Sequence, residues 1–300
     1  MKQVRKPYSK HSIPQQAFDW YDDYAHGRMD RRTFLSRLAT LSVMGFSVPS
    51  LLGGLTPDYA QAEQVSFNDP AIKASFQIFP SPSGHGEGRG YWVAPTGTTE
   101  TRPGVLVVHE NRGLNPYIKD VARRLAKAGF VAFAPDALYP VGGYPGNDDA
   151  GRDLQRNLSR HKIEADFLAA ASFLKGHSAT TSKTGAVGFC FGGYMVNYLV
   201  AAGKNLLDAG VVFYGTPAAE ELQNNINTPL LIHLAGLDER VNSSWPSYES
   251  KLRQLKADFE MHEYEGANHG FHNDSTARYS PGDAELAWQR TLAFFDRHLR

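Results

Sequence analysis

The most constraining feature of this sequence is the hexapeptide GFCFGG at residues 188–193, which contains the only cysteine among 300 residues. An apolar run, residues 184–189, leads into it, and a helix-like run, residues 193–202, follows it. A strand, a sharp turn and a helix in this order are typical of a nucleophile elbow, and the glycines fit its close backbone approach. We therefore predict that Cys190 is a nucleophile, facing the N–H of Phe191 and the positive end of the following helix.

A lone cysteine is also common as a small buried apolar residue, so the residue type alone does not show whether Cys190 is a nucleophile.

The composition of the chain argues against several classes of function. Lys plus Arg and Asp plus Glu both number 31, and no long basic stretch occurs, so nucleic acid is not an expected partner. One cysteine excludes an internal disulfide and a Cys-rich zinc site, and it leaves no second thiol for dithiol redox chemistry.

Apolar runs and helical patterns alternate along the chain from about residue 63, which predicts an α/β fold with a mostly parallel sheet flanked by helices. The expected strands are 105–108, 131–134, 185–189, 210–214, 230–234 and 259–264. The expected helices are 118–128, 163–174, 195–202, 248–255 and 284–299. We interpret the glycine-rich stretches 83–90 and 141–146 as loops, and residues 63–300 as a single domain.

A thiol nucleophile needs a base and a group that orients the base. In folds that carry a nucleophile elbow, the chain order is nucleophile, acid, histidine. Asp238 follows the strand predicted at 230–234, and His269 follows the one predicted at 259–264. Each residue is also a plausible plain loop residue by itself, but together with Cys190 they fit one mechanism. We predict that His269 takes the thiol proton and that Asp238 orients the imidazole.

The loop after the strand 105–108 carries further candidates. An oxyanion hole needs two donors, and we expect the backbone N–H of Phe191 and one from this loop, at Glu110 or Asn111. Glu110 itself would raise the pKa of the thiol and compete for its proton, whereas a solvated charged loop is the alternative. His269 and His272 have a spacing that can suit a metal, but no second group of ligands accompanies them, so we predict no metal.

These residues resemble the dienelactone hydrolase family of α/β-hydrolases. The resemblance rests on the 188–193 motif, His109-Glu110, Ala134-Pro135-Asp136, the Asp238 loop and Asn268-His269-Gly270-Phe271, and it spans about residues 75–298. It implies the α/β-hydrolase fold and carboxymethylenebutenolidase-like cleavage of enol-lactones and activated esters without a cofactor. It also implies a Cys190, Asp238 and His269 triad in which Glu110 controls the thiol.

One departure concerns the substrate. Family members that act on dienelactone carry an arginine shortly after the histidine, and here none occurs before Arg278. Arg112, Arg152 and Arg240 are possible substitutes for binding a substrate anion, although an arginine at such positions is more often a plain surface residue. We expect Tyr144 and Trp245 to line the pocket, with plain packing as the alternative.

The predicted function is therefore a cysteine-dependent hydrolase of small-molecule esters or lactones that acts through an acyl-enzyme. Two alternatives stay open: a peptidase or thioesterase of the same fold, and a non-catalytic or thiol-sensing α/β protein in which Cys190 reacts with oxidants.

Residues 1–62 form a separate N-terminal extension. It contains paired arginines at 31–32, twenty uncharged residues at 38–57 and a small-x-small site at 60–62. These features indicate a twin-arginine export signal, hence a periplasmic or exported protein. The acidic stretch 18–24 is atypical of such a signal, so helices packed on the body, a homodimer arm and a cytoplasmic location stay open. Pro49 and the glycines argue against a stable membrane span.

Overall fold

The computed structural model describes residues 13–97 and 100–300 and contains one mixed sheet of eight strands in the order β1-β2-β4-β3-β5-β6-β7-β8. β2 pairs antiparallel with β1 and β4, and all other neighbours are parallel. The strands are β1 Ile72–Ser81, β2 Gly86–Pro95, β3 Arg102–Val108, β4 Val131–Pro135, β5 Thr180–Phe189, β6 Ala209–Phe213, β7 Leu230–Ala235 and β8 Phe259–Tyr264. This architecture confirms the predicted mostly parallel sheet.

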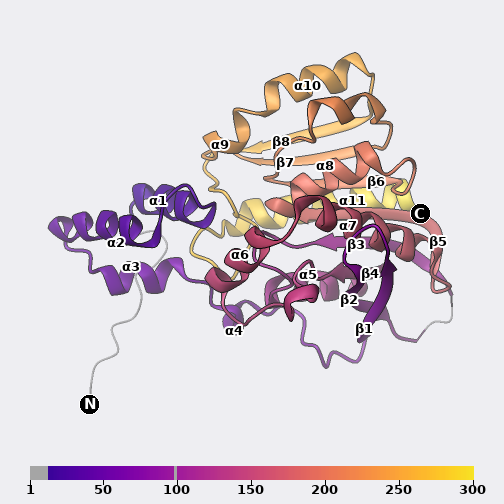
Figure 1. Cartoon of the computed structure of the whole chain (residues 1–300), viewed down its shortest axis with the longest axis horizontal. Helices are drawn as coiled ribbons and strands as arrows, with labels where there is room; N and C mark the ends of the chain where they lie inside the picture. Colours follow the sequence, from indigo (N-terminus) through magenta and orange to yellow (C-terminus); the bar gives the residue numbers. More distant parts are fainter. Residues whose placement is uncertain (1–12, 98–99) are drawn as a thin grey trace.

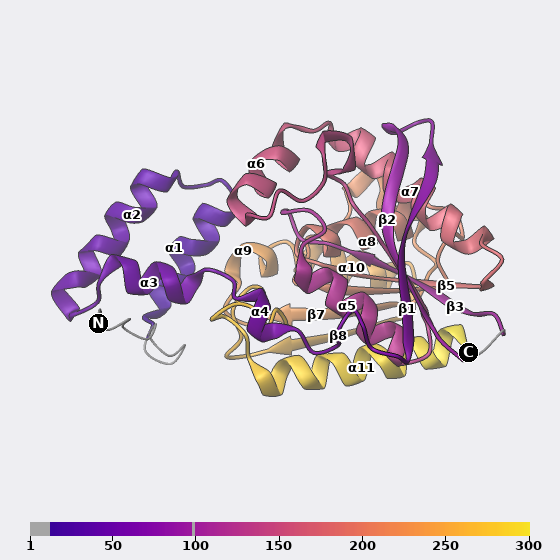
Figure 2. The same cartoon turned by 90° about the horizontal axis from the view of Figure 1, so that it is seen from below.

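Helices cover both faces of the sheet (Figures 1 and 2). Those of the body are α5 Pro116–Lys127, α6 Asp148–Asn157, α7 Arg160–Gly176, α8 Phe191–Ala202, α9 Glu239–Asn242, α10 Trp245–Gln254 and α11 Pro281–Leu299, with the short helices η3 Tyr139–Val141 and η4 Glu220–Asn225. All five helices and six strands expected in the body are present, with ends shifted by a few residues.

Two apolar cores lie on opposite faces of the sheet because successive strand residues point to opposite sides. Val105 and Val107 of β3 pack in the core that α5 and α11 cover. Leu106 and Val108 pack in the core that α7, α8 and α10 cover. The strands are thus buried on both faces, which is why they appear in the sequence as continuous apolar runs.

One local expectation was wrong: residues 86–90 are not loop but the start of β2, which forms a hairpin with β1. The glycines that suggested a loop have a packing role instead. A Cβ at Gly90 would overlap the ring of Phe133, which lies on the neighbouring strand β4. Gly88, against Phe79, and Gly90 therefore make room for aromatic rings against the sheet.

The N-terminal extension forms a helical lobe beside the body (Figures 1 and 2). Its elements are α1 Gln15–Ala25, α2 Arg31–Thr40, η2 Leu41–Met44, α3 Val48–Leu55 and α4 Tyr59–Ala62. Phe18, Phe34, Leu38 and Leu51 are part of an apolar cluster of its own. Within the described residues no single helix is long and apolar enough to cross a membrane, although the pair 31–44 and 48–62, bent by 116°, meets that test when taken together.

Candidate active site

Cys190 lies in a strained turn between β5 and α8. Its φ of 56° and ψ of −112° are rare for a residue with a side chain, and its N–H donates to the carbonyl of Phe213 on β6 at 3.0 Å. A Cβ at Gly188 would overlap the backbone of Gly192, and one at Gly192 would overlap the backbone of Val108. The two glycines are therefore required by the close approach of β3 and α8, and the turn has the predicted elbow geometry.

Asp238 and His269 meet at the carboxyl ends of β7 and β8. His269 Nδ1 lies 2.5 Å from Asp238 Oδ2, and both side chains are buried. Asp238 also caps α9, because its Oδ1 accepts from the N–H of Val241 at 3.2 Å. The other ring nitrogen of His269, Nε2, is buried without a partner among the described residues. The structure thus brings both residues to the same sheet edge as Cys190.

The charges at this edge favour an ion pair between Cys190 and His269. Burial alone would raise the pKa of Cys190, but the positive charges of His269 and His26 outweigh it and hold this pKa well below its usual range. Burial likewise lowers the pKa of His269, whereas Asp238 and the thiolate raise it more strongly, to about 10. The arrangement therefore favours a thiolate beside an imidazolium at neutral pH.

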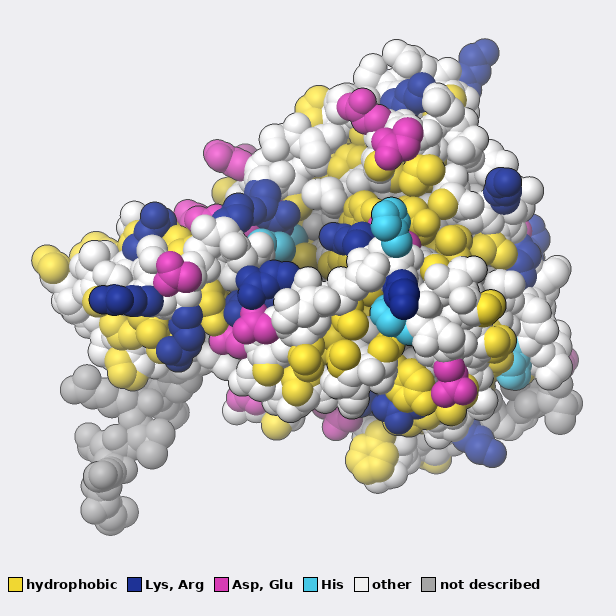
Figure 3. All heavy atoms as spheres, in the orientation of Figure 1, with side chains coloured by type: hydrophobic (Ala, Val, Ile, Leu, Met, Phe, Trp, Pro, Cys, Tyr) yellow, Lys and Arg dark blue, Asp and Glu magenta, His cyan; other side chains and the backbone are white. Residues whose placement is uncertain are grey.

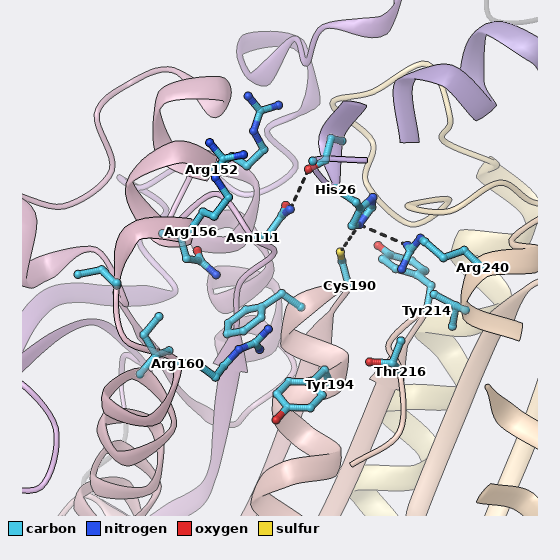
Figure 4. A pocket seen from close by; sticks show the side chains of 17 residues that line it. His26, Asn111, Arg152, Arg156, Arg160, Cys190, Tyr194, Tyr214, Thr216 and Arg240 are labelled. Carbon is cyan, nitrogen blue, oxygen red and sulfur yellow. Dashed lines mark hydrogen bonds between the residues drawn. The ribbon is translucent and has the colours of Figure 1, made fainter. Parts of the chain in front are cut away.

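The sulfur has a second imidazole neighbour that sequence analysis did not find. His26, which follows α1, places its Nε2 3.2 Å from Cys190 Sγ (Figure 4). Its Nδ1 lies 2.8 Å from the carbonyl oxygen of Asp22 and 3.1 Å from the Asp22 carboxylate. The acidic stretch 18–24, unusual for an export signal, was the available clue, because residues 22 and 26 share a helix face.

Arg240 connects the two histidines. Its Nη2 lies 3.3 Å from His26 Nε2 and 3.2 Å from His269 Nδ1, while its Nε donates to Asp22 at 3.2 Å. Ring nitrogens of both histidines and Cys190 Sγ lie within 4.8 Å of one another, a group that by ligand type could suit Zn²⁺. The guanidinium of Arg240 already places a positive charge against these nitrogens.

A cavity of about 560 Å³ opens beside Cys190, between the helical lobe and the body. Figure 3 shows basic side chains around the hollow where the lobe meets the body, and Figure 4 shows the labelled arginines on the cavity wall. The residues that line it include Ala25, His26, Asn111, Arg152, Arg156, Arg160, Cys190, Phe191, Tyr194, Tyr214 and Arg240. No Asp or Glu of the described chain is among those that line it.

Glu110, Asn111 and Phe191 lie near Cys190. Burial and the nearby charge of Cys190 raise the pKa of Glu110, whose Oε2 accepts from Asn273 at 3.1 Å. The N–H of Phe191 belongs to the first turn of α8, where helical donors have no partner within the helix. Asn111 lines the cavity, and its side chain donates to the carbonyl of Ala25 at 3.0 Å.

Three predicted binding residues lie away from this cavity. Arg112 is buried, with Nη1 2.9 Å from Asp148 and 3.1 Å from the hydroxyl of Tyr21, so it joins the body to the lobe. The hydroxyl of Tyr144 also bonds Asp148, at 2.8 Å. Trp245 is buried in a core and donates to the carbonyl of Gly215 at 3.0 Å.

Tyr214 and His272 also lie where the sequence-based expectations did not place them. Tyr214, which was not predicted, lines the cavity, and its ring lies 5.0 Å from that of His269. His272, considered as a metal ligand, is instead buried and lies 2.7 Å from the hydroxyl of Tyr117.

Comparison with known proteins agrees with this geometry. The family model described as dienelactone hydrolase matches residues 89–299. The chain belongs to the dienelactone hydrolase family. A separate model, described as YqhI-like, matches residues 6–43, so the segment that carries α1 and α2 resembles sequences outside that family model. Its first residues, 6–12, lie outside the described part of the chain.

Individual relatives support the same family and fold. The chain is 62% identical over 104 residues to "Putative hydrolase fragment YghX" of Escherichia coli K12, covering 35% of this chain and 89% of that one. It is 31% identical to a Bradyrhizobium protein named "Probable 2-oxo-3-(5-oxofuran-2-ylidene)propanoate lactonase", covering 72% and 92%. The crystal structure titled "Putative Dienelactone Hydrolase" from Klebsiella pneumoniae matches with a TM-score of 0.65 at 26% identity, covering 75% and 99%. The predicted α/β-hydrolase fold and family are thereby confirmed.

Proposed function

We propose that this member of the family hydrolyses carboxylic esters or lactones by transient acylation of Cys190. The observation that carries the proposal is the position of the sulfur: it lies on the elbow, next to a buried imidazole–carboxylate pair, and borders a cavity large enough for a small molecule. The name of the Bradyrhizobium relative, a lactonase, supports a cyclic ester as one substrate type.

In the proposed reaction the Cys190 thiolate attacks the carbonyl carbon, the carbon–sulfur bond forms and the carbon–oxygen bond to the leaving group breaks. The tetrahedral oxyanion accepts hydrogen bonds from the backbone N–H groups of Phe191 and Asn111. The leaving oxygen takes a proton from an imidazolium beside Cys190. Water then attacks the thioester, returns a proton to that neutral imidazole and releases the acid and the free enzyme. Asp238 holds the ring of His269 beside the sulfur.

Glu110 has a supporting role in this proposal. Its carboxyl is buried beside the nucleophile, and the pKa of Glu110 rises because burial and the Cys190 charge disfavour its ionised form. A protonated Glu110 tolerates the thiolate, whereas an ionised one repels it and favours the thiol. Glu110 therefore adjusts how much thiolate the resting enzyme carries.

The cavity wall favours an anionic substrate. Arg160 has no carboxylate within ion-pair distance in the described chain, and its guanidinium lies over the rings of Phe191 and Tyr194 at 5.0 and 4.8 Å from their centroids. Arg152 and Arg156 lie on the same wall but pair with Asp153. A substrate carboxylate would find in Arg160 a charged donor that no acid of the described residues pairs with.

The test is hydrolysis of p-nitrophenyl acetate and a panel of lactones by the purified full-length chain and its Cys190→Ala variant. We expect turnover by the wild-type protein and a loss of about 10³-fold or more in kcat on removing the thiol. Activity that survives in Cys190→Ala would contradict the proposal.

A further inference from the structure

Cys190 lies between two imidazole–carboxylate pairs rather than one. The first, Asp238 and His269, comes from the loops after β7 and β8. The second, Asp22 and His26, comes from the N-terminal lobe, outside the residues that the dienelactone hydrolase model matches. The two imidazole rings meet edge to face with centroids 4.9 Å apart.

The local structure of α1 explains how the second pair is held. Residues 22 and 26 are one helical turn apart, so the Asp22 carboxylate and carbonyl both reach His26 Nδ1 and leave Nε2 to face the sulfur. His26 is the C-cap of α1, where the negative end of the helix dipole favours an imidazolium. Asp22 is itself held by Arg240 and Arg28, each at 3.2 Å.

The lobe that carries this pair is fixed to the body at several points around the site. Tyr24 donates to Asp149 at 2.6 Å, and the Ala25 carbonyl accepts from Asn111 at 3.0 Å. Tyr21 accepts from Arg112 at 3.1 Å. His26 therefore occupies a built position and is not the end of a loose segment.

The two histidines face different spaces. The cavity of about 560 Å³ is lined by Cys190 and His26 but not by His269. His269 instead lines a neighbouring hollow of about 490 Å³, together with Asp22, Asp238 and Arg240. A substrate whose carbonyl reaches Cys190 from the larger cavity thus meets the imidazole of His26 within that cavity. With α1 packed on the body, the larger cavity remains open beside Cys190 Sγ.

We propose that His26 is a second catalytic imidazole, which holds the Cys190 thiolate and gives its Nε2 proton to the oxygen of the leaving group. This inference rests on the proposed ester or lactone hydrolysis. In the acylation step the thiolate bonds the carbonyl carbon, the carbon–oxygen bond breaks with its electron pair on oxygen, and the His26 proton neutralises that oxygen. In deacylation, water attacks the thioester, and the neutral His26 accepts the proton that the water loses, which restores the resting charge of the imidazole pair.

The separate roles of His269 and His26 have a chemical reason. In a single-histidine triad one imidazole both accepts the nucleophile's proton and protonates the leaving group. Here His269, held by Asp238, faces away from the larger cavity, whereas His26 borders it. Asp22 and Arg240 are positioning residues, because they touch His26 rather than the reacting atoms.

The test uses the full-length protein and two esters that share an acyl group, one with a p-nitrophenolate leaving group and one with a simple alkoxide. A nitrophenolate leaves without a proton, whereas an alkoxide requires one. We expect His26→Gln to lower kcat/KM for the alkyl ester about 10²-fold and that for the p-nitrophenyl ester less than about threefold. His161→Gln is the matched control, because His161 also faces a carboxylate on its own helix, Glu164, but is 97% exposed.

A second measurement guards against a folding defect. In His26→Ala, added imidazole should restore part of the alkyl-ester activity, and it should not do so in Cys190→Ala. Equal losses on both esters or unchanged activity in His26→Gln would overturn the proposal. Faster turnover in His26→Gln would also overturn it, because it would show that α1 inhibits the site. Failure of the wild-type protein to turn over any ester, or full activity in Cys190→Ala, would instead refute the proposed hydrolase.

Discussion

At the scale of single residues, the charge state of Cys190 depends on groups from four parts of the chain. His269 and His26 lower its pKa, and Arg240 adds a further positive charge near both. Burial and Glu110 act in the opposite direction. The balance favours the thiolate because the imidazoles are close to the sulfur, whereas Glu110 can avoid the conflict by keeping its proton.

This balance of charges predicts how the reactivity of the Cys190 thiol depends on pH. Alkylation of Cys190 by iodoacetamide should stay nearly constant from about pH 7 to about pH 9, whereas an ordinary thiol with a pKa of about 8.5 reacts about tenfold faster per pH unit below that value. His269→Asn should raise the pKa of Cys190 towards its ordinary range and restore part of this dependence, because it removes the largest positive charge that acts on the sulfur and leaves that of His26. An ordinary profile in the wild-type protein would contradict the ion pair.

The raised pKa of His269 also makes the free energy of unfolding depend on pH. The pKa of His269 rises from 6.5 to about 10 in the folded protein. Taken by itself, the raised pKa of His269 therefore stabilises the fold fully below about pH 6.5, and this contribution is lost as the pH rises through about 10.

At the scale of elements, α6 and α7 decide the character of the cavity. α6 contributes Arg152 and Arg156, and the first residue of α7 is Arg160. The sequence pattern predicts the helix α7 but not α6. Arg152, named there as a substitute for the missing arginine, does line the cavity, whereas Arg112 is used to attach the lobe.

Arg160→Gln tests the preference for an anion. We expect KM to rise about tenfold or more for a p-nitrophenyl ester whose acyl chain ends in a carboxylate, because a charge-assisted hydrogen bond is lost. KM for the neutral ester of equal length should change less than about twofold. Arg253→Gln, at an exposed arginine of α10 paired with Glu249, is the control. Equal changes for both esters would argue against an anionic substrate.

At the scale of the whole molecule, the lobe of residues 13–62 completes one wall of the site through Ala25, His26 and Gly27. Export by the twin-arginine route stays a prediction, and its cleavage step is incompatible with the function proposed for His26. Cleavage near Glu63 would remove both Asp22 and His26 from the mature protein.

N-terminal sequencing and intact mass of the native protein separate these possibilities. We expect the native protein to retain α1, because Ala17, Tyr21, Tyr24 and Ala25 are buried and several polar bonds join α1 to the body. An N-terminus near Glu63 in the native protein would show that the enzyme works without the second imidazole.

The elbow, the chain order of Cys190, Asp238 and His269, and the alternation that produces the sheet can be read from the sequence. These are local patterns, and the strand ends of a parallel sheet bring the residues that follow them to one edge. The contact of His26 with the sulfur and the position of Arg160 on the cavity wall appear only in the folded structure. Their placement depends on how α1 and α7 pack against the sheet, and long-range packing of this kind leaves no periodic signal in the chain.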